Sequence, residues 1–219
     1  MKKIVAVIGN ANIDNDIEKQ EFAFEIGKLV IDNGYILATG GLGGVMEYAS
    51  KGAKNSENYT ENSIIGILPD YHTDNVNQFI DIAFPTGLGL GRNLILISLS
   101  NAIIAIGGGS GTLNEISAAW QMNKLIVAIK TEGWSENLCG KALDKRRDDI
   151  IFCAETASQA IEIINEKITA YETRKFEGIK KSQTKEDKLI GYFSEINKLN
   201  YEKDKLIEEF HKYFGYIEK

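Results

Sequence analysis

Near the middle of the chain lies the stretch Ala102-Ile103-Ile104-Ala105-Ile106-Gly107-Gly108-Gly109-Ser110-Gly111-Thr112. The apolar run predicts a buried strand, the glycine-rich run a turn, and the periodicity of Leu113 to Met122 a helix directly after it. Glycines let the backbone approach a ligand closely, and the unpaired amides and dipole of a helix start favour an anion. We therefore expect Gly107 to Thr112 to bind phosphate; a purely structural turn is the alternative. We call this segment the second glycine turn, because another glycine-rich turn precedes it in the chain.

Apolar runs of four to six residues alternate with helical segments along most of the chain, which is typical of βαβ units. Their near-continuous hydrophobicity fits strands that are buried on both faces of a sheet. We expect an α/β fold, a Rossmann-like, doubly wound parallel sheet of about seven strands, at 4–8, 35–38, 63–68, 80–84, 102–106, 125–129 and 150–153. The expected helices span 17–32, 44–53, 92–100, 113–122 and 157–168, and the last begins with a Thr156-x-x-Gln159 capping pattern.

The composition changes near residue 170, where the strands stop and lysine and glutamate become abundant. We therefore expect a Rossmann-like nucleotide- or phosphate-binding domain at 1–170 and a helical C-terminal extension at 171–219. Apolar residues at spacings of mainly three and four predict one amphipathic helix in the extension, with Leu189, Phe193, Ile196, Leu199, Leu206, Phe210 and Phe214 on its apolar stripe. The stripe would pack on its own domain or on a second subunit, or it would bind another protein.

The overall composition limits the class of protein. The chain has 219 residues, 43% hydrophobic and 26% charged, which is usual for a globular protein, and no apolar run approaches the ~20 residues that span a bilayer. A net charge of −6 gives no general attraction to nucleic acids or membranes, and we interpret the basic run 141–147 as a solvated helix end. Two cysteines, Cys139 and Cys153, fit neither a metal site nor a disulfide scaffold, which favours a reducing compartment. We expect a cytoplasmic protein with no metal, no cofactor, and no nucleic-acid or membrane partner.

Further loops follow other expected strands. The first glycine turn, Gly40-Gly41-Leu42-Gly43-Gly44, comes before a helix, and Gly9-Asn10-Ala11-Asn12 follows the first strand. Carboxyl ends of parallel strands share one edge of a sheet, so these loops should converge with the second glycine turn on one crevice. The second glycine turn has neither the Gly-Lys-Ser/Thr end of a P-loop nor G-x-G-x-x-G spacing, so the prediction depends on the convergence.

Two charged residues accompany these loops. Arg92 follows a glycine-rich segment, 87–91, and could clamp a phosphate or stabilise developing negative charge, or could form an ordinary surface salt bridge. Glu115 could act on a ligand, but Thr112-x-x-Glu115 also matches a capping box, in which the carboxylate only accepts a backbone amide. The spacing leaves both functions open for Glu115.

Three segments together resemble the Lonely Guy-like superfamily (LOG or SLOG, long mislabelled "possible lysine decarboxylase"): Thr39-Gly40-Gly41-x-Gly43-Gly44-Val45-Met46, Gly91-Arg92-Asn93, and Gly107-Gly108-Gly109-x-Gly111-Thr112-x-x-Glu115. The resemblance covers about residues 3 to 168. It implies a homodimeric nucleoside 5'-monophosphate phosphoribohydrolase, which releases the free base and ribose 5-phosphate, with Arg92 and Glu115 as the catalytic pair. The loops and the resemblance together predict ligand-binding residues at Gly9, Asn10, Gly40, Gly41, Gly43, Gly44, Met46, Asn93, Gly107, Gly108, Gly109, Ser110, Gly111 and Thr112.

This chain departs from the hydrolases at two positions. They usually have proline where this chain has Gly107, and lysine after the arginine where this chain has Asn93. The variant is similar to the branch near the molybdenum-cofactor carrier proteins, which bind a phosphate-bearing pterin without hydrolysing a glycosidic bond. A non-catalytic carrier or sensor of a nucleotide-like or molybdopterin-type ligand is therefore the alternative function, and an oligomeric scaffold with a vestigial pocket is a third. Nothing frames a Schiff-base lysine, so a lysine decarboxylase is not expected.

Overall fold

The computed structural model describes residues 1–174, of which Met1–Thr173 form one compact unit. Seven strands, all parallel, follow the order β4-β3-β2-β1-β5-β6-β7 across one sheet. Their bounds are β1 (Ile4–Gly9), β2 (Ile36–Thr39), β3 (Ile64–Leu68), β4 (Ile82–Pro85), β5 (Ala102–Ile106), β6 (Leu125–Ile129) and β7 (Phe152–Ala154). The expected doubly wound, Rossmann-like fold is confirmed. The chain builds outward from β1 to β4 and returns to β5 on the other side of β1, so the topological switch point lies between β1 and β5.

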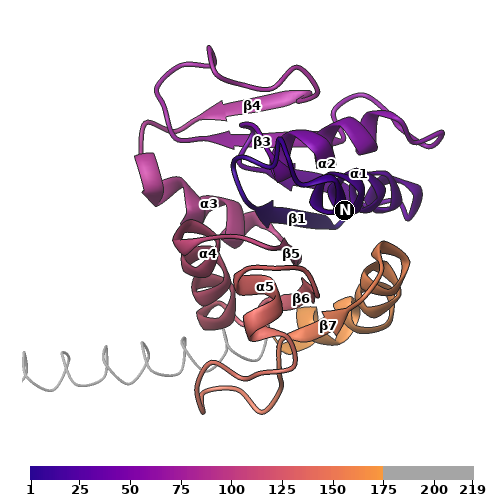
Figure 1. Ribbon diagram of the computed structural model, residues 1–219, viewed down its shortest axis with the longest axis vertical. Coiled ribbons are helices and arrows are strands. Elements are labelled where there is room, and N and C mark those ends of the chain that lie inside the picture. Colours follow the sequence, from indigo (N-terminus) through magenta and orange to yellow (C-terminus); the bar gives the residue numbers. More distant parts are fainter. Residues whose placement is uncertain (175–219) are drawn as a thin grey trace, which may run out of the picture. The chain divides into compact units, whose positions relative to one another are not determined.

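Helices cover both faces of the sheet (Figure 1). They are α1 (Ile17–Asp32), α2 (Val45–Lys54), α3 (Arg92–Leu99), α4 (Ser110–Gln121), α5 (Trp134–Leu138), the short 3-10 helix η1 (Gly89–Gly91) and a helical segment at 157–174. Alternate residues of β1 point to opposite faces. Val5 and Val7 pack with α1, α2 and the segment 157–174, whereas Ala6 and Ile8 pack with α3 and α4.

The central strands are wholly buried, as their apolar sequences predict. Every residue of β5 and β6 has at most 1% of its surface exposed, because helices lie on both faces and strands on both edges. Both strands have the predicted bounds, and the predicted bounds of the other strands lie within two residues of the observed ones. This rigid centre holds the loops at its carboxyl edge.

Several local expectations need correction. Helix α4 begins at Ser110, three residues before the predicted start, and α5 was not predicted. The run 141–147 is not a solvated helix end: it lies in a loop, and Arg147 is buried against the Trp120 ring with its guanidinium on Asp149. The capping interaction at Thr156 does form, since its hydroxyl accepts the Gln159 N–H at 3.1 Å.

The cysteine count suggested a reducing compartment, yet Cys139 and Cys153 form a disulfide that joins the residue after α5 to β7. The proposed division near residue 170 stays a prediction. The predicted amphipathic stripe from Leu189 to Phe214 lies outside the described residues.

Candidate functional site

A pocket of about 330 Å³ lies at the carboxyl ends of β1, β2 and β5, next to the switch point. Its size is within the range of small-molecule sites. It is lined by Val7, Ile8, Gly9, Asn10, Ala11, Gly40, Met46, Leu90, Arg92, Asn93, Gly109, Ser110, Gly111, Thr112 and Glu115. The three predicted loops and both charged residues therefore meet at one place.

The second glycine turn divides into two functional halves. The Gly107 N–H donates to the Ser135 hydroxyl at 2.7 Å, and the Gly108 N–H donates to Asn10 Oδ1 at 2.7 Å. Because both amides are occupied by the protein, neither is offered to a ligand, and neither glycine lines the pocket. The lining half runs from Gly109 to Thr112.

The start of α4 supplies the donors of that lining half. The N–H groups of Ser110, Gly111 and Thr112 belong to the first turn of α4, where a helix provides no acceptor. These three residues line a pocket at the positive end of the helix dipole, which is the arrangement that binds phosphate or carboxylate. This half of the turn can therefore bind an anion without a lysine.

Glu115 is not a capping residue. Gly109 is the N-cap of α4, so Thr112 lies inside the helix and cannot start a capping box with Glu115. The Glu115 Oε1 atom instead lies 3.1 Å from Nη1 of Arg92, the first residue of α3. The capping interpretation is wrong.

The Arg92–Glu115 pair is buried on the pocket wall. The side chains are only 12% and 8% exposed, respectively, and both residues line the pocket. Burial raises the pKa of Glu115 to about 7, although the nearby Arg92 guanidinium acts in the opposite direction. Near neutral pH, Glu115 can therefore exchange a proton when a ligand changes its surroundings.

The guanidinium of Arg92 lies over Gly40, the first residue of the first glycine turn. A Cβ atom at Gly40 would be 2.6 Å from Arg92 Nη2 and 2.6 Å from the Met46 sulfur. Gly40 is thus needed because a larger residue would occupy the space of the arginine. Of the predicted residues in this segment, Gly40 and Met46 line the pocket, and Gly41, Gly43 and Gly44 do not.

Asn93 lies in the pocket wall beside the ion pair. Its side chain is buried and donates to Asn114 Oδ1 at 3.1 Å, so it links α3 to α4. This bond fixes the spacing of the two helices that carry Arg92 and Glu115.

Three lining residues were not predicted: Val7, Ile8 and Leu90. Val7 and Ile8 belong to β1 and are indistinguishable in sequence from ordinary core residues. Leu90 lies in η1 and is 81% exposed, and its position among glycines was the signal that could have identified it. These residues contribute to the apolar part of the pocket lining.

Two kinds of feature are absent from residues 1–174. No group of three or more histidine, cysteine, aspartate or glutamate side chains there could hold a metal ion. In the same part of the chain, no helix combines the length and hydropathy needed to cross a membrane.

Comparison with known proteins places the chain in one family. Residues 2–161 match the model of the SLOG cluster4 family. The chain belongs to this family. An uncharacterised protein of Archaeoglobus fulgidus is 38% identical over 126 residues, which cover 58% of this chain and 79% of the relative.

Solved structures of similar sequence have the same fold. The molybdenum cofactor binding protein of the phototrophic bacterium Rippkaea orientalis is 34% identical, with a TM-score of 0.67 over 77% of this chain and 98% of that one. The molybdenum cofactor carrier protein of Chlamydomonas reinhardtii is 33% identical, with a TM-score of 0.65 over 77% of this chain and 99% of that one. The expected branch of the superfamily is confirmed.

Proposed function

We propose that this protein binds and holds a phosphate-bearing pterin of the molybdopterin type without chemically altering it. The observation that carries the proposal is the lining half of the second glycine turn, whose helix-start amides face a pocket beside the Arg92 guanidinium. The likeness to two proteins described as binding or carrying the molybdenum cofactor supports this ligand class.

The pocket offers a suitable contact for the phosphate, for a second polar group and for the flat ring of such a ligand. The phosphate would accept hydrogen bonds from the amides of Ser110, Gly111 and Thr112, where the dipole of α4 favours negative charge. Arg92 would contact a second negative or carbonyl oxygen, and the flat ring would lie against the apolar side near Leu90. No other side chain is required for retention.

Hydrolysis of a nucleoside 5'-monophosphate is the second candidate, and one observation favours it. Glu115 is a buried carboxyl in the pocket wall, and a carboxylate near a sugar can stabilise an oxocarbenium-like transition state or orient water. In this structure Arg92 already engages that carboxyl, so the pair can have a structural role that needs no turnover.

Mass spectrometry of the ligand that denaturation releases from the full-length protein distinguishes the two functions. We expect an intact pterin cofactor to co-purify or to bind on addition, and no base to be released from a panel of nucleoside 5'-monophosphates. Release of a base that stops in Glu115→Gln would overturn the carrier function in favour of hydrolysis. An empty protein that binds neither the cofactor nor a nucleotide would contradict both.

Arg92→Ala tests the proposed binding wall. Truncation removes a charge-assisted hydrogen-bond donor, so affinity for the cofactor should fall by about 10- to 100-fold. Lys51→Ala, which removes an exposed cation from the far end of α2, is the matched control and should leave the affinity unchanged. Isothermal titration of the three proteins gives the comparison, and equal affinities would show that the ligand is held elsewhere.

We also propose a homodimer or higher homo-oligomer in the cytoplasm. Leu88, Leu90, Leu94 and Ile95 are 38–81% exposed on and beside η1 and α3, close to the pocket mouth. Four large apolar side chains on neighbouring turns are typical of a contact surface. Sedimentation of wild type and of Leu90→Ser/Leu94→Ser would test it, since the substitutions should produce monomers.

A further inference from the structure

Helix α5 is held at its beginning by the second glycine turn. The Trp134 N–H donates to the Gly108 carbonyl at 3.1 Å, and the Ser135 N–H donates to the Gly107 carbonyl at 2.9 Å. The buried Ser135 hydroxyl accepts the Gly107 N–H and donates to the Ile129 carbonyl, both at 2.7 Å. Ser135 thus joins the turn to the end of β6, and α5 fixes the half of the turn from which the lining half continues.

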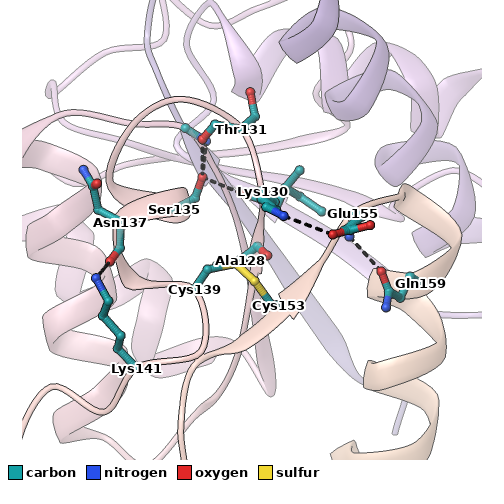
Figure 2. The surroundings of a disulfide bond; sticks show 12 residues. Ala128, Lys130, Thr131, Ser135, Asn137, Cys139, Lys141, Cys153, Glu155 and Gln159 are labelled. Carbon is teal, nitrogen blue, oxygen red and sulfur yellow. Dashed lines mark hydrogen bonds and ion pairs between the residues drawn. A yellow bond between two sulfur atoms is a disulfide. The ribbon is translucent and has the colours of Figure 1, made fainter.

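The same helix is held at its end by the disulfide. Cys139 directly follows α5 and is bonded to Cys153 in β7, with the two Cα atoms 4.9 Å apart (Figure 2). Backbone bonds accompany the disulfide, from Gly140 N–H to the Ile151 carbonyl and from Ile151 N–H to the Lys141 carbonyl. In Figure 2, Ser135 and Cys139 mark the two ends of this helix.

A helix this short depends on its attachments. Five residues are far below the length at which an isolated helix is stable, so α5 stays folded because both of its ends are tied. Short, exposed elements of this kind open locally more readily than the core. Loss of the covalent tie would therefore increase opening of α5 and, with it, movement of Gly107 and Gly108.

We propose that the Cys139–Cys153 disulfide is a redox-sensitive lock that, through α5, holds the second glycine turn in its ligand-binding form. Both cysteines are partly exposed, so a dithiol reductant can reach them. In the exchange the reductant's two thiols become a disulfide and supply two electrons; the Cys139–Cys153 bond breaks, and each cysteine sulfur takes a proton. The effect on the ligand depends on the proposed function, whereas the effect on α5 does not.

Hydrogen exchange of the full chain, read by mass spectrometry, tests the lock without any ligand. After reduction, with thiols counted by alkylation, the hydrogen-bonded amides of Gly107 and Gly108 and those at 134–139 should exchange about tenfold faster, and those of α1 should not change. Cys139→Ser/Cys153→Ser should reproduce the reduced pattern and be insensitive to the reductant. Unchanged exchange with both thiols shown to be free would overturn the lock, as would free thiols in the oxidised protein.

Two variants separate a lock from general loss of stability. Ser135→Ala keeps the disulfide but removes the hydroxyl that contacts the turn, so the Gly107 amide should exchange faster in both redox states. Ile164→Val weakens the core on the opposite face of the sheet and should leave exchange at 107–112 unchanged. If Ile164→Val and Ser135→Ala have the same effect on the turn, the lock is refuted.

Titration with the molybdenum cofactor tests whether the redox state of the disulfide changes ligand affinity. We expect affinity to fall about tenfold on reduction of wild type and to be redox-independent in the double serine variant. If exchange responds to reduction but neither redox state binds the cofactor, the proposed function fails and the lock stands. If the cofactor binds equally in both states and exchange does not respond, the lock fails and the proposed function stands.

Discussion

The first and second glycine turns have similar sequences and lie at the same edge of the sheet, but their glycines serve different purposes. In the first turn, the Gly41 N–H donates to the Thr39 hydroxyl and the Val45 N–H, first in α2, donates to the Asn10 carbonyl. The first amide of α2 thus has an acceptor within the protein. At the start of α4, Ser110, Gly111 and Thr112 instead line the pocket, and the helix itself offers their amides no acceptor.

This difference shows that glycine content does not identify a binding loop. What matters is whether the first amides of the following helix find acceptors within the protein. The first turn contributes mainly space, since Gly40 makes room for Arg92, while the second contributes hydrogen-bond donors. Substitutions in the two turns should therefore affect different properties.

The largest expected contrast is between Gly44→Ala and Gly111→Ala. Gly44 has a φ of 66°, and a Cβ there would be 2.3 Å from the Asn10 carbonyl oxygen, so the variant should lose roughly 3 kcal/mol of unfolding free energy. Gly111 lies in α4 with open space around a Cβ, so alanine should change stability by about 1 kcal/mol at most, in the stabilising direction. Because Gly111 lines the pocket, the added methyl group should instead crowd the ligand and strongly weaken cofactor binding.

Urea unfolding and cofactor titration of both variants would measure this contrast. A stable Gly44→Ala, or a Gly111→Ala that binds normally, would contradict the division of functions between the two turns.

The sheet could be predicted from the sequence because its signal is local. Seven apolar runs bounded by turns and separated by helices fit one class of fold, and β5 and β6 were placed to the residue. Arg92 and Glu115 were named, but their pairing could not be predicted, because 23 residues separate them and only the packing of α3 on α4 brings them together. The start of α4 was misplaced because Gly109-Ser110-Gly111 suggests a turn, whereas in the structure Ser110 and Gly111 already belong to the helix.

Features that depend on several distant contacts could not be predicted. Helix α5 has five residues and no apolar periodicity, and it forms because the second glycine turn and the disulfide hold it. The disulfide itself gave no signal, since its cysteines lie 14 residues apart and meet only when β7 joins β6.

Charge gives the next largest contrast, because only the helix after the second turn brings a carboxyl into the pocket. Burial raises the pKa of Glu115 from 4.5 to about 7, a shift equivalent to ~3 kcal/mol between the protonation states. The folded protein therefore binds more protons than the unfolded chain between these values. This contribution to stability is complete below pH 4.5 and is lost as pH rises through 7.

As pH is raised from 4.5 to 8, wild type should thus lose unfolding free energy relative to Glu115→Gln, by an amount approaching ~3 kcal/mol. Urea unfolding of both proteins across this pH range measures the difference in unfolding free energy. The other titrating groups are the same in both proteins, so their contributions cancel in this difference. Ile164→Val serves as a control that lowers stability without changing its pH dependence. A constant gap between wild type and Glu115→Gln would show that the carboxyl is solvated in the folded protein.

Gly40→Ala tests the contribution of space. Its Cβ would displace the Arg92 guanidinium and the Met46 sulfur, both at 2.6 Å, rather than backbone atoms. Because flexible side chains can move, stability should change little, but the misplaced arginine should weaken cofactor binding about tenfold. Arg92→Ala is the matched background: adding Gly40→Ala to it should cause no further loss, and an additive loss would mean that Gly40 contacts the ligand independently.

The smallest expected effect comes from Thr39→Val, which tests whether the first turn is purely structural. The substitution keeps the shape of the buried side chain but removes the hydroxyl that accepts the Gly41 N–H at 3.1 Å. An unsatisfied buried amide should cost about 1 kcal/mol of unfolding free energy. Cofactor affinity should not change, since neither Thr39 nor Gly41 lines the pocket. Weaker binding in a variant that remains fully folded would show that the first turn transmits its geometry to the ligand, and that the two turns act as one site.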